Sequence, residues 1–352
     1  MATIRDVAVM AGVSTATVSH VVNETRVVSE PLRQKVAAAM LALDYQPDAV
    51  ARSLRRRETL TLGLMVPSVE IPFFARVAKH MEHAAKAAGY SIILCNSDWS
   101  LERELIYLDN LLARRVDGLV CISLAMRSEH LTPLLKTGTP IVWFERNIPH
   151  AEIDAVYLDN HKGAYAATSH LIELGHRRIG CITGLPTSKL HHDRIAGYRQ
   201  ALTEHGLPFD RELLRVGNYT PASGQQAAAD FLALTRPPSA IFAFNDLMAM
   251  GVLQTLQSRG LRVPDDVAVI GFDGVTLCEH LCPPLSTVEQ PVPAMSRRAM
   301  ELLMDRINGT APPEARIVVL PPQLIVRAST VGYASTAAEP HASYRRTEDV
   351  YV

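Results

Sequence analysis

The chain has 352 residues, of which 48% are hydrophobic and 20% charged, a balance that excludes a disordered or collagen-like chain. Its length exceeds that of one ordinary domain. Lys and Arg number 35 against 36 Asp and Glu, so the net charge of −1 excludes a uniformly basic nucleic-acid coat. The charge is nevertheless unevenly distributed. Residues 1–57 hold eight basic and five acidic side chains, a net charge of +3, whereas the rest of the chain holds 27 basic and 31 acidic side chains, a net charge of −4.

The N-terminal stretch MATIRDVAVMAGVS has an acid at Asp6 and lacks the apolar core of a signal peptide. No apolar run reaches the roughly 18 to 20 residues that span a bilayer. We therefore expect a cytoplasmic, nucleoid-associated protein with no membrane partner.

Residues 1–48 carry helix signals without strand alternation. Thr3 precedes Asp6 at the spacing of a capping box, Gly12 interrupts the helical pattern, and Ser14 can cap a second helix, which a third follows. Helix, glycine-containing turn, helix is the helix-turn-helix pattern, whose second helix can enter the major groove of DNA. A small solvated helical cap would show the same spacing and is the alternative.

From about residue 60 onward, short apolar runs typical of strands alternate with amphipathic helical stretches. After the first run, apolar residues recur with a 3.6-residue period up to Gly89, which predicts a helix. This alternation predicts parallel α/β sheets, and nine runs favour two similar lobes that divide near residues 159–162 and enclose a cleft. The runs are Leu60–Val66, Ser91–Cys95, Gly118–Ile122, Pro140–Phe144, Ala155–Leu158, Arg178–Thr183, Leu213–Val216, Ala240–Phe244 and Val267–Phe272.

Neither the cysteines nor the histidines suggest a metal site or a cofactor. Cys95, Cys121 and Cys181 lie inside strand-like runs, so buried free thiols are expected. Cys278 and Cys282 lack the Cys-x-x-Cys spacing or second pair of a zinc site. The adjacent His191 and His192, beside Asp193, cannot easily aim at one ion.

The run ATIRDVAVMAGVSTATVSHVVN, followed by VSEPLRQKVAAAMLALDYQPDAVARSL, closely resembles the DNA-binding segment of LacI/GalR-family transcriptional regulators. The runs RVDGLV, ELGHRRIGCITG, RIAGY, FNDLMAMG and GLRVPDDVAVIGFD extend the resemblance over about residues 2–330. The headpiece is most similar to purine-responsive members, and the core to sugar-responsive ones. The resemblance implies a helix-turn-helix DNA-binding domain at 1–48, a hinge helix and linker at 49–59, and a two-lobed effector-binding and dimerisation core, similar to periplasmic sugar-binding proteins, at 60–330. The polar, aperiodic tail at 331–352 is expected to be disordered.

The headpiece offers two kinds of DNA contact. Thr15, Ala16 and His20 fall on or near the exposed start of the second helix, where they can meet base edges, and Arg5 can donate to guanine. Small hydrogen-bonding side chains suited to phosphates, for which ordinary capping is the alternative, are Ser14, Thr17, Ser19 and Asn23.

The segment AVARSLRRR at residues 49–57 surrounds Leu54 with four arginines, among them Arg55. The resemblance implies that this leucine wedges between base pairs in the minor groove while the arginines contact phosphates. Without the resemblance, a charged linker with one stray leucine is the simpler interpretation.

Polar and aromatic side chains follow the predicted strands, where ligands of parallel α/β sheets bind. Carboxylates accept hydrogen bonds from hydroxyl groups, an arginine fork donates two, and an aromatic face can cover a sugar ring. The charges nearly balance, which favours a neutral sugar over a phosphorylated one. As alternatives to effector binding, Glu145 can pair with Arg146, and Asp246 can cap the helix that follows it. The candidate effector-binding residues are Phe73, Phe74, Asp98, Ser123, Arg146, Arg194, Tyr219, Asn245, Asp246 and Asp273.

Two positions depart from the purine-responsive pattern. Those members carry an arginine and a threonine that read a nucleobase, and this chain has Ser188 and Leu190 there. The departure argues against a purine effector, although a nucleobase or another non-sugar metabolite remains the alternative to a sugar.

The chain lacks the G-x-G-x-x-G, G-x-x-x-x-G-K-[ST] and G-x-S-x-G motifs, so an enzyme, including a sugar-binding one, is the weaker hypothesis. A transport-associated binding protein would not carry the helix-turn-helix. The sequence predicts a homodimeric regulator, typically a repressor of carbohydrate uptake or catabolism, that binds near-palindromic double-stranded DNA under allosteric control by a small sugar.

Overall fold

A computed structural model of the chain describes residues 2–23, 26–45, 58–123, 126, 130, 135–145, 153–186 and 189–332. The chain forms two compact units, Met1–Leu60 and Thr61–Val352. Several predictions fall outside the described residues: most of the hinge with Leu54 and Arg55, the pocket residue Arg146, Ser188, and the tail from residue 333 onward.

The described part of the first unit contains three helices, α1 (Ile4–Ala11), α2 (Thr15–Asn23) and α3 (Glu30–Ala42). The predicted capping box is present: the backbone N–H of Thr3 donates to the Asp6 carboxylate at 2.7 Å, and the Asp6 N–H donates to the Thr3 hydroxyl. Gly12 ends α1 at a φ of +67°, which glycine adopts without steric penalty. Ser14 caps α2 by accepting from the Thr17 N–H at 3.1 Å.

One fully buried valine from each helix, namely Val7, Val18 and Val36, forms the centre of this unit's core. The three helices therefore fold around their own apolar cluster. The predicted helix-turn-helix is confirmed.

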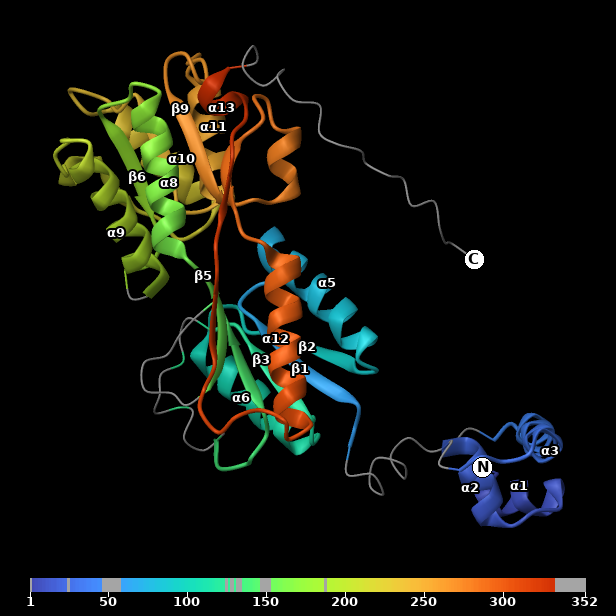
Figure 1. Ribbon diagram of the computed structural model, residues 1–352. Helices are drawn as coiled ribbons and strands as arrows, with labels where there is room; N and C mark the ends of the chain where they lie inside the picture. The colour runs from blue at the N-terminus through green and yellow to red at the C-terminus, as the bar shows by residue number, and fades with distance from the viewer. Residues whose placement is uncertain are drawn as a thin grey trace. The chain divides into compact units, whose positions relative to one another are not determined.

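The second unit contains two lobes, each built on a six-stranded sheet (Figure 1). The first sheet is parallel throughout, in the order β11-β5-β4-β3-β1-β2. Its strands are β1 (Thr61–Val66), β2 (Ser91–Asn96), β3 (Gly118–Cys121), β4 (Ile141–Phe144), β5 (Asp154–Leu158) and β11 (Ile317–Leu320). Among the described residues, the helices of this lobe include α5 (Pro72–Ala87), α6 (Leu101–Ala113) and α12 (Val292–Ile307).

Neighbouring residues of β1 face different cores. Leu64 belongs to the cluster that includes Met81 of α5, and Met65 belongs to the one that includes Leu111 of α6. Because helices cover both faces, the strands read as continuous apolar runs, which is why they are visible in the sequence.

The second sheet has the order β12-β10-β9-β8-β6-β7 and is parallel except for β12, which pairs antiparallel with β10. Its strands are β6 (Ile179–Thr183), β7 (Leu214–Val216), β8 (Ala240–Ala243), β9 (Ala268–Asp273), β10 (Ser286–Glu289) and β12 (Gln323–Ile325). Its helices are α8 (Asn160–Glu173), α9 (Lys189–Glu204), η1 (Arg211–Leu213), α10 (Pro221–Leu232), α11 (Asp246–Ser258), η2 (Thr276–His280) and α13 (Ala328–Val331).

The chain passes between the lobes three times: at residue 159, at 290–291 and at 321–322. The predicted division near 159–162 matches the first passage, and all nine predicted strands are present. The strands β10, β11 and β12 were not predicted: polar residues interrupt β10 (STVE) and β12 (QLI), and β11 (IVVL) is a partly exposed strand at the edge of its sheet. The two-lobed parallel α/β fold is therefore confirmed, but each lobe is assembled from segments that are not consecutive.

The predicted buried thiols are confirmed for Cys95, Cys121 and Cys181, all of which are free and buried. Cys278 is also buried, and Cys282 is exposed. Among the described helices, none combines the length and hydropathy that crossing a bilayer requires.

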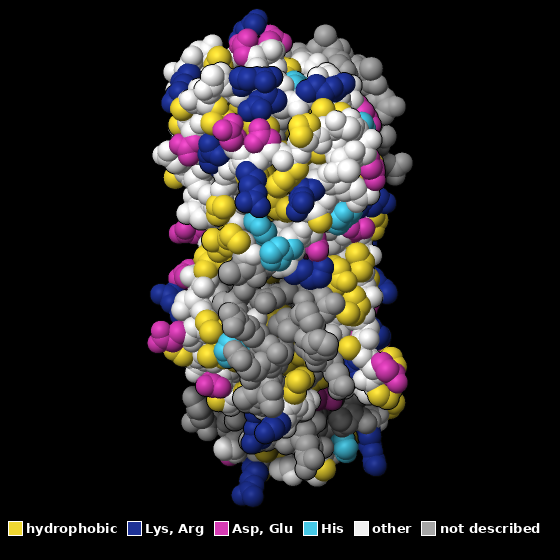
Figure 2. All heavy atoms as spheres, turned by 90° about the vertical axis from the view of Figure 1, so that its left-hand side faces the viewer, with side chains coloured by type: hydrophobic (Ala, Val, Ile, Leu, Met, Phe, Trp, Pro, Cys, Tyr) yellow, Lys and Arg dark blue, Asp and Glu magenta, His cyan; other side chains and the backbone are white. Residues whose placement is uncertain are grey.

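The lobe that carries α9 shows Lys and Arg side chains alongside Asp and Glu on the face seen in Figure 2. Within this lobe Arg178 pairs with Asp210 at 3.1 Å, and Arg215 pairs with Asp230 at 3.6 Å. Interspersed charges of opposite sign produce little net potential, so this face is a poor match for DNA.

Candidate functional site

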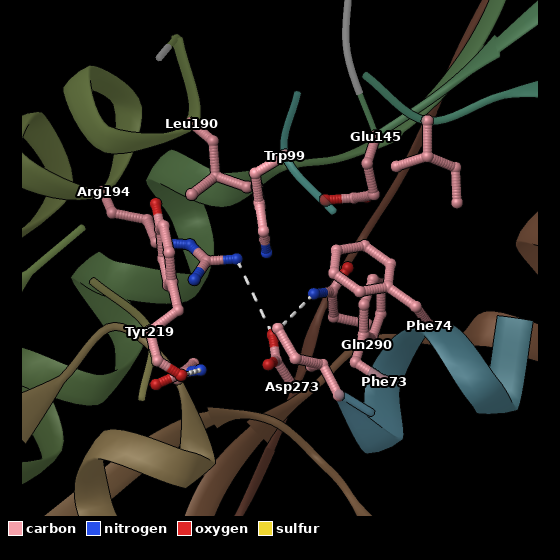
Figure 3. A pocket seen from close by; sticks show the side chains of 12 residues that line it. Phe73, Phe74, Trp99, Glu145, Leu190, Arg194, Tyr219, Asp273 and Gln290 are labelled. Carbon is pink, nitrogen blue, oxygen red and sulfur yellow. Dashed lines mark hydrogen bonds and ion pairs between the residues drawn. The ribbon is translucent and has the colours of Figure 1, made fainter. Parts of the chain in front are cut away.

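A cavity of about 50 Å³ lies between the two lobes of the second unit. Most of its wall comes from residues that follow the carboxyl ends of strands, as expected for parallel sheets. Figure 3 shows their side chains converging from both lobes. The wall is formed by Ile71, Phe73, Phe74, Trp99, Ile122, Glu145, Leu190, Arg194, Tyr219, Asn245, Asp273 and Gln290.

Aromatic rings form a continuous apolar side of the cavity. Phe73 and Phe74, in the first turn of α5, meet edge to face at 5.2 Å between centroids, and Phe74 meets Trp99 at 5.9 Å. Trp99 of the first lobe stacks on Tyr219 of the second at 6.1 Å, with 6° between the ring planes. A flat ring or the C–H face of a sugar suits such a surface.

Arg194 is held in place by contacts within the protein. Its side chain is 2% exposed and lies over the Phe272 ring, with Cζ 3.5 Å from the centroid. Nε donates to Asn160 Oδ1 at 2.8 Å, Nη1 donates to the Phe244 carbonyl, and Nη2 lies 4.0 Å from Asp273 Oδ1. These contacts hold the charged end at the cavity wall.

Asp273 faces Arg194 across the cavity floor and accepts from Gln290 Nε2 at 2.9 Å. Burial raises the pKa of Asp273, and the cation of Arg194 opposes that shift. The pair places a hydrogen-bond acceptor and a donor side by side, which matches vicinal hydroxyl groups.

Two buried oxygens of the wall accept no hydrogen bond from the described residues: Glu145 Oε2 and Gln290 Oε1. Glu145 Oε1 does accept, from the Leu158 N–H at 3.1 Å. Burial raises the pKa of Glu145 to about 7. Buried polar oxygens without hydrogen-bond partners are unfavourable, so this side of the cavity suits a ligand that brings hydrogen-bonding groups.

The backbone is strained around the same cavity. Trp99, Glu145 and Tyr219 have φ values of +62°, +62° and +68°, and Asp273 has +114°. A non-glycine residue in this region costs on the order of 1–3 kcal/mol, and such residues cluster at ligand sites because the surrounding structure must enforce them.

Six of the candidate effector residues line the cavity, and three others lie outside its wall. Asp98 accepts from Asn96 Nδ2 at 2.6 Å and pairs with Arg103. Ser123 donates to the carboxylate of Glu104 at 2.6 Å. The six that line it are Phe73, Phe74, Arg194, Tyr219, Asn245 and Asp273.

Asp246 is the third of these and lies buried behind the wall. It accepts from the Thr287 hydroxyl at 2.6 Å and from the Val275 N–H at 2.9 Å. It thus holds the loop after β9. The helix cap that sequence allowed for Asp246 is made by Asn245, whose Oδ1 accepts from the Met248 N–H at 2.9 Å.

Six wall residues are not among the predicted candidates, and four of them, Ile71, Trp99, Ile122 and Gln290, were not considered at all. Trp99 carried a usable signal, because it is an aromatic residue directly after a predicted strand. Gln290 carried none, because β10 was not predicted. Glu145 and Leu190 were considered but not selected.

In the first unit, the expected DNA contacts Arg5, Ser14, Thr15 and Ala16 are exposed. Thr17 and His20 are half-buried. Ser19 is 9% exposed, which turns most of it toward the helical core. The side chain of Asn23 lies outside the described part of the chain.

A three-helix helix-turn-helix unit joined to a two-lobed α/β core with a cavity defines a ligand-responsive DNA-binding regulator. The model "Bacterial regulatory proteins, lacI family" matches residues 3–48, and "Periplasmic binding protein-like domain" matches residues 168–330. The chain belongs to the LacI family and is a DNA-binding transcriptional repressor, not an enzyme.

Curated relatives resemble the chain over almost its whole length. The "HTH-type transcriptional repressor PurR" of Photobacterium profundum is 39% identical over 330 residues, which are 94% of this chain and 98% of the relative. The protein of the same name from Aliivibrio fischeri is 38% identical over 334 residues, covering 94% and 99%.

Solved structures of transcriptional regulators also resemble the chain over most of its length. The complex of the transcriptional regulator CelR with cellobiose has a TM-score of 0.71 and 35% identity, and covers 94% of this chain and 100% of that chain. The lac repressor dimer bound to operator and the anti-inducer ONPF has a TM-score of 0.84 and 28% identity, and covers 94% and 99%.

Proposed function

We propose that the cavity binds a neutral, polyhydroxylated effector, a sugar, and that its occupancy controls the affinity of the repressor for DNA. The observation that carries the proposal is the pair of buried oxygens that make no hydrogen bond within the described residues, Glu145 Oε2 and Gln290 Oε1, beside the Asp273–Arg194 pair. A hydroxyl group both donates and accepts, so several of them on one ring can pair with these oxygens whether Glu145 is protonated or ionised.

Two further features support a sugar. The aromatic side formed by Phe74, Trp99 and Tyr219 suits the C–H face of a pyranose or furanose ring. Leu190 contributes an apolar side chain to the wall at one of the two positions where purine-responsive members carry a residue that reads the nucleobase. The complex of CelR with cellobiose supports the same ligand class.

A purine base is the second candidate, and the relatives named PurR favour it. The nearly parallel rings of Trp99 and Tyr219 suit a planar base as well as a sugar. The two candidates differ in the donors they offer: a sugar ring carries several hydroxyl groups, and an oxopurine carries only a few N–H groups.

Isothermal titration calorimetry with cellobiose, glucose, ribose, hypoxanthine and guanine separates these candidates. We expect heat from at least one sugar and none from the bases. Binding of a base with no sugar binding contradicts the proposal. Asp265→Asn, which changes an exposed carboxylate of the second lobe, is the matched control for cavity variants.

For the DNA side, we propose that Arg5, Thr15, Ala16 and His20 contact bases and that Ser14, Thr17, Ser19 and Asn23 position phosphates. We further propose that the repressor acts as a homodimer on a near-palindromic operator of a carbohydrate gene cluster, with Leu54 in the minor groove and Arg55 on phosphates. The operator-bound lac repressor dimer supports this arrangement. Selection of duplexes from a random pool tests it: enriched sequences without inverted symmetry contradict the dimer.

A further inference from the structure

Arg76 joins the two lobes beside the cavity. It lies on α5 of the first lobe, one turn after Phe73. Its Nη1 donates to the Gly274 carbonyl at 2.8 Å, and its Nη2 pairs with Glu289 Oε1 at 2.8 Å, both in the second lobe. The Arg76 and Glu289 side chains are 24% and 31% exposed, so water screens the pair only partly.

The two partners of Arg76 are the chain neighbours of two cavity residues. Gly274 follows Asp273, and Glu289 precedes Gln290. Asp273 and Glu289 are paired in the register of β9 and β10, and the Gln290 side chain donates to Asp273. These two dipeptides therefore each present one residue to the cavity and one to Arg76.

The second-lobe side of this contact is rigid. The Gly274 N–H donates to the Thr287 hydroxyl at 3.3 Å, and that hydroxyl donates to the buried Asp246. A Cβ on Gly274 would lie 2.6–2.7 Å from Glu289, so the two residues already touch. A displacement of Asp273 or Gln290 is consequently transmitted to the partners of Arg76.

We propose that Arg76 is an interlobe latch: a positioning residue that ties α5 to the Asp273–Gly274 and Glu289–Gln290 dipeptides, so that ligand contact at the cavity floor and closure of the lobes occur together. The inference rests on the proposed effector role of the cavity. It assigns to Arg76 a role in transmission, because the side chain itself lies outside the cavity wall.

Trp99 provides a readout that needs neither effector nor DNA. The chain has two tryptophans, and Trp143 is 1% exposed in the core of the first lobe, whereas Trp99 lies across the cleft on Tyr219. Opening of the lobes separates Trp99 from Tyr219 and exposes it. Acrylamide quenching of tryptophan fluorescence therefore reports the open population, and a Trp99→Phe variant identifies the responding residue.

The test compares Arg76→Gln and Glu289→Gln with the wild-type protein. We expect each to raise the quenching constant of Trp99 about twofold or more, since losing the latch shifts the population toward the open arrangement. Arg76→Lys, which keeps the charge but not the two-pronged donor, should give an intermediate value. Arg298→Gln, which breaks an exposed pair with Glu301 on α12, is the matched control and should leave the constant unchanged.

Thermal melts at the same pH show whether each variant is folded. A role confined to stability lowers the melting temperature and leaves quenching unchanged well below the transition. Unchanged quenching in folded Arg76→Gln and Glu289→Gln overturns the latch. A failure of every sugar to bind overturns the proposed function instead, because the quenching assay contains no ligand.

Discussion

The headpiece and the effector cavity hold their candidate functional residues in opposite ways. Those of the headpiece, such as Thr15 and Ala16, are exposed and lie close together in the sequence. Those of the cavity, such as Arg194 and Asp273, are buried, lie far apart in the sequence and contact one another. Substitutions of exposed headpiece residues such as Thr15 should therefore change DNA binding with little effect on stability, whereas substitutions of buried cavity residues can change effector binding, stability or both.

The largest expected effect is on the stability of the protein and concerns Glu145, a buried residue of the cavity. Burial raises its folded-state pKa to about 7 from 4.5. The stabilisation by the protonated form is therefore fully present below about pH 4.5 and is lost as the pH rises through about 7, a change of about 3 kcal/mol. Glu145→Gln should remove this dependence and be more stable than wild type at pH 8.

Urea unfolding at pH 5, 6.5 and 8 measures the effect for Glu145. Glu301→Gln, at an exposed pair on α12, is the control and should follow the wild-type curve. Parallel curves for Glu145→Gln and wild type would show that Glu145 is ionised in the folded protein.

A second prediction separates binding from stability at Asp273. Asp273→Asn should weaken binding of the effector by about 1.5–3 kcal/mol, or roughly 10- to 150-fold in affinity, because it removes a charged hydrogen-bond acceptor. Burial raises the pKa of this carboxyl, so its ionised form opposes folding and the variant should retain its melting temperature at pH 8. Calorimetry with the tightest sugar of the panel and thermal melts measure the two quantities. Equal sugar affinities would remove Asp273 from the binding site.

The third prediction concerns DNA binding by Arg5, an exposed residue of the headpiece. Arg5→Ala should lose about 1–3 kcal/mol of discrimination at one base pair, with the melting temperature of the core unchanged. Fluorescence anisotropy with a selected operator and a scrambled duplex measures this loss. Lys35→Ala, on the exposed side of α3, is the control and should affect both duplexes alike. An equal loss on both duplexes for Arg5→Ala would reassign Arg5 to a phosphate.

The smallest effect concerns the local stability of the headpiece. Thr3→Ala removes the capping hydroxyl of α1 and should lower its stability by about 1 kcal/mol. Hydrogen exchange of the α1 amides measures the change. Ser29→Ala is a matched control, because the Ser29 side chain makes no capping hydrogen bond to α3. Equal exchange in the two variants would argue against a contribution from the capping box.

Much of the architecture was predictable because its signals are local. The capping box of Thr3 and Asp6 lies within four residues, and buried strands such as β4 are unbroken apolar runs. The strands β10, β11 and β12 were not predictable in this way: none of them is a fully buried apolar run, and their positions depend on pairing with other strands, most of them distant in the sequence.

Of the cavity, sequence supplied the residues that directly follow a visible strand or match the family motifs. It did not separate Asn245 from Asp246, since both are polar and follow β8. The helix start directs Asn245 toward Tyr219, whose carbonyl it contacts at 3.0 Å, whereas Asp246 turns to Thr287. The sequence likewise did not separate Asp98 from Trp99, and only the Trp99 side chain lines the cavity.

The sequence by itself determined the family, the helix-turn-helix and the alternation of strands and helices, because each is written in residues a few positions apart. Tertiary structure alone decided which polar side chains share the cavity, that burial raises the pKa of Glu145 and of Asp273, and that Arg76 connects the lobes. Burial and long-range contacts depend on how the three passages of the chain bring the two sheets together, and no local pattern encodes them.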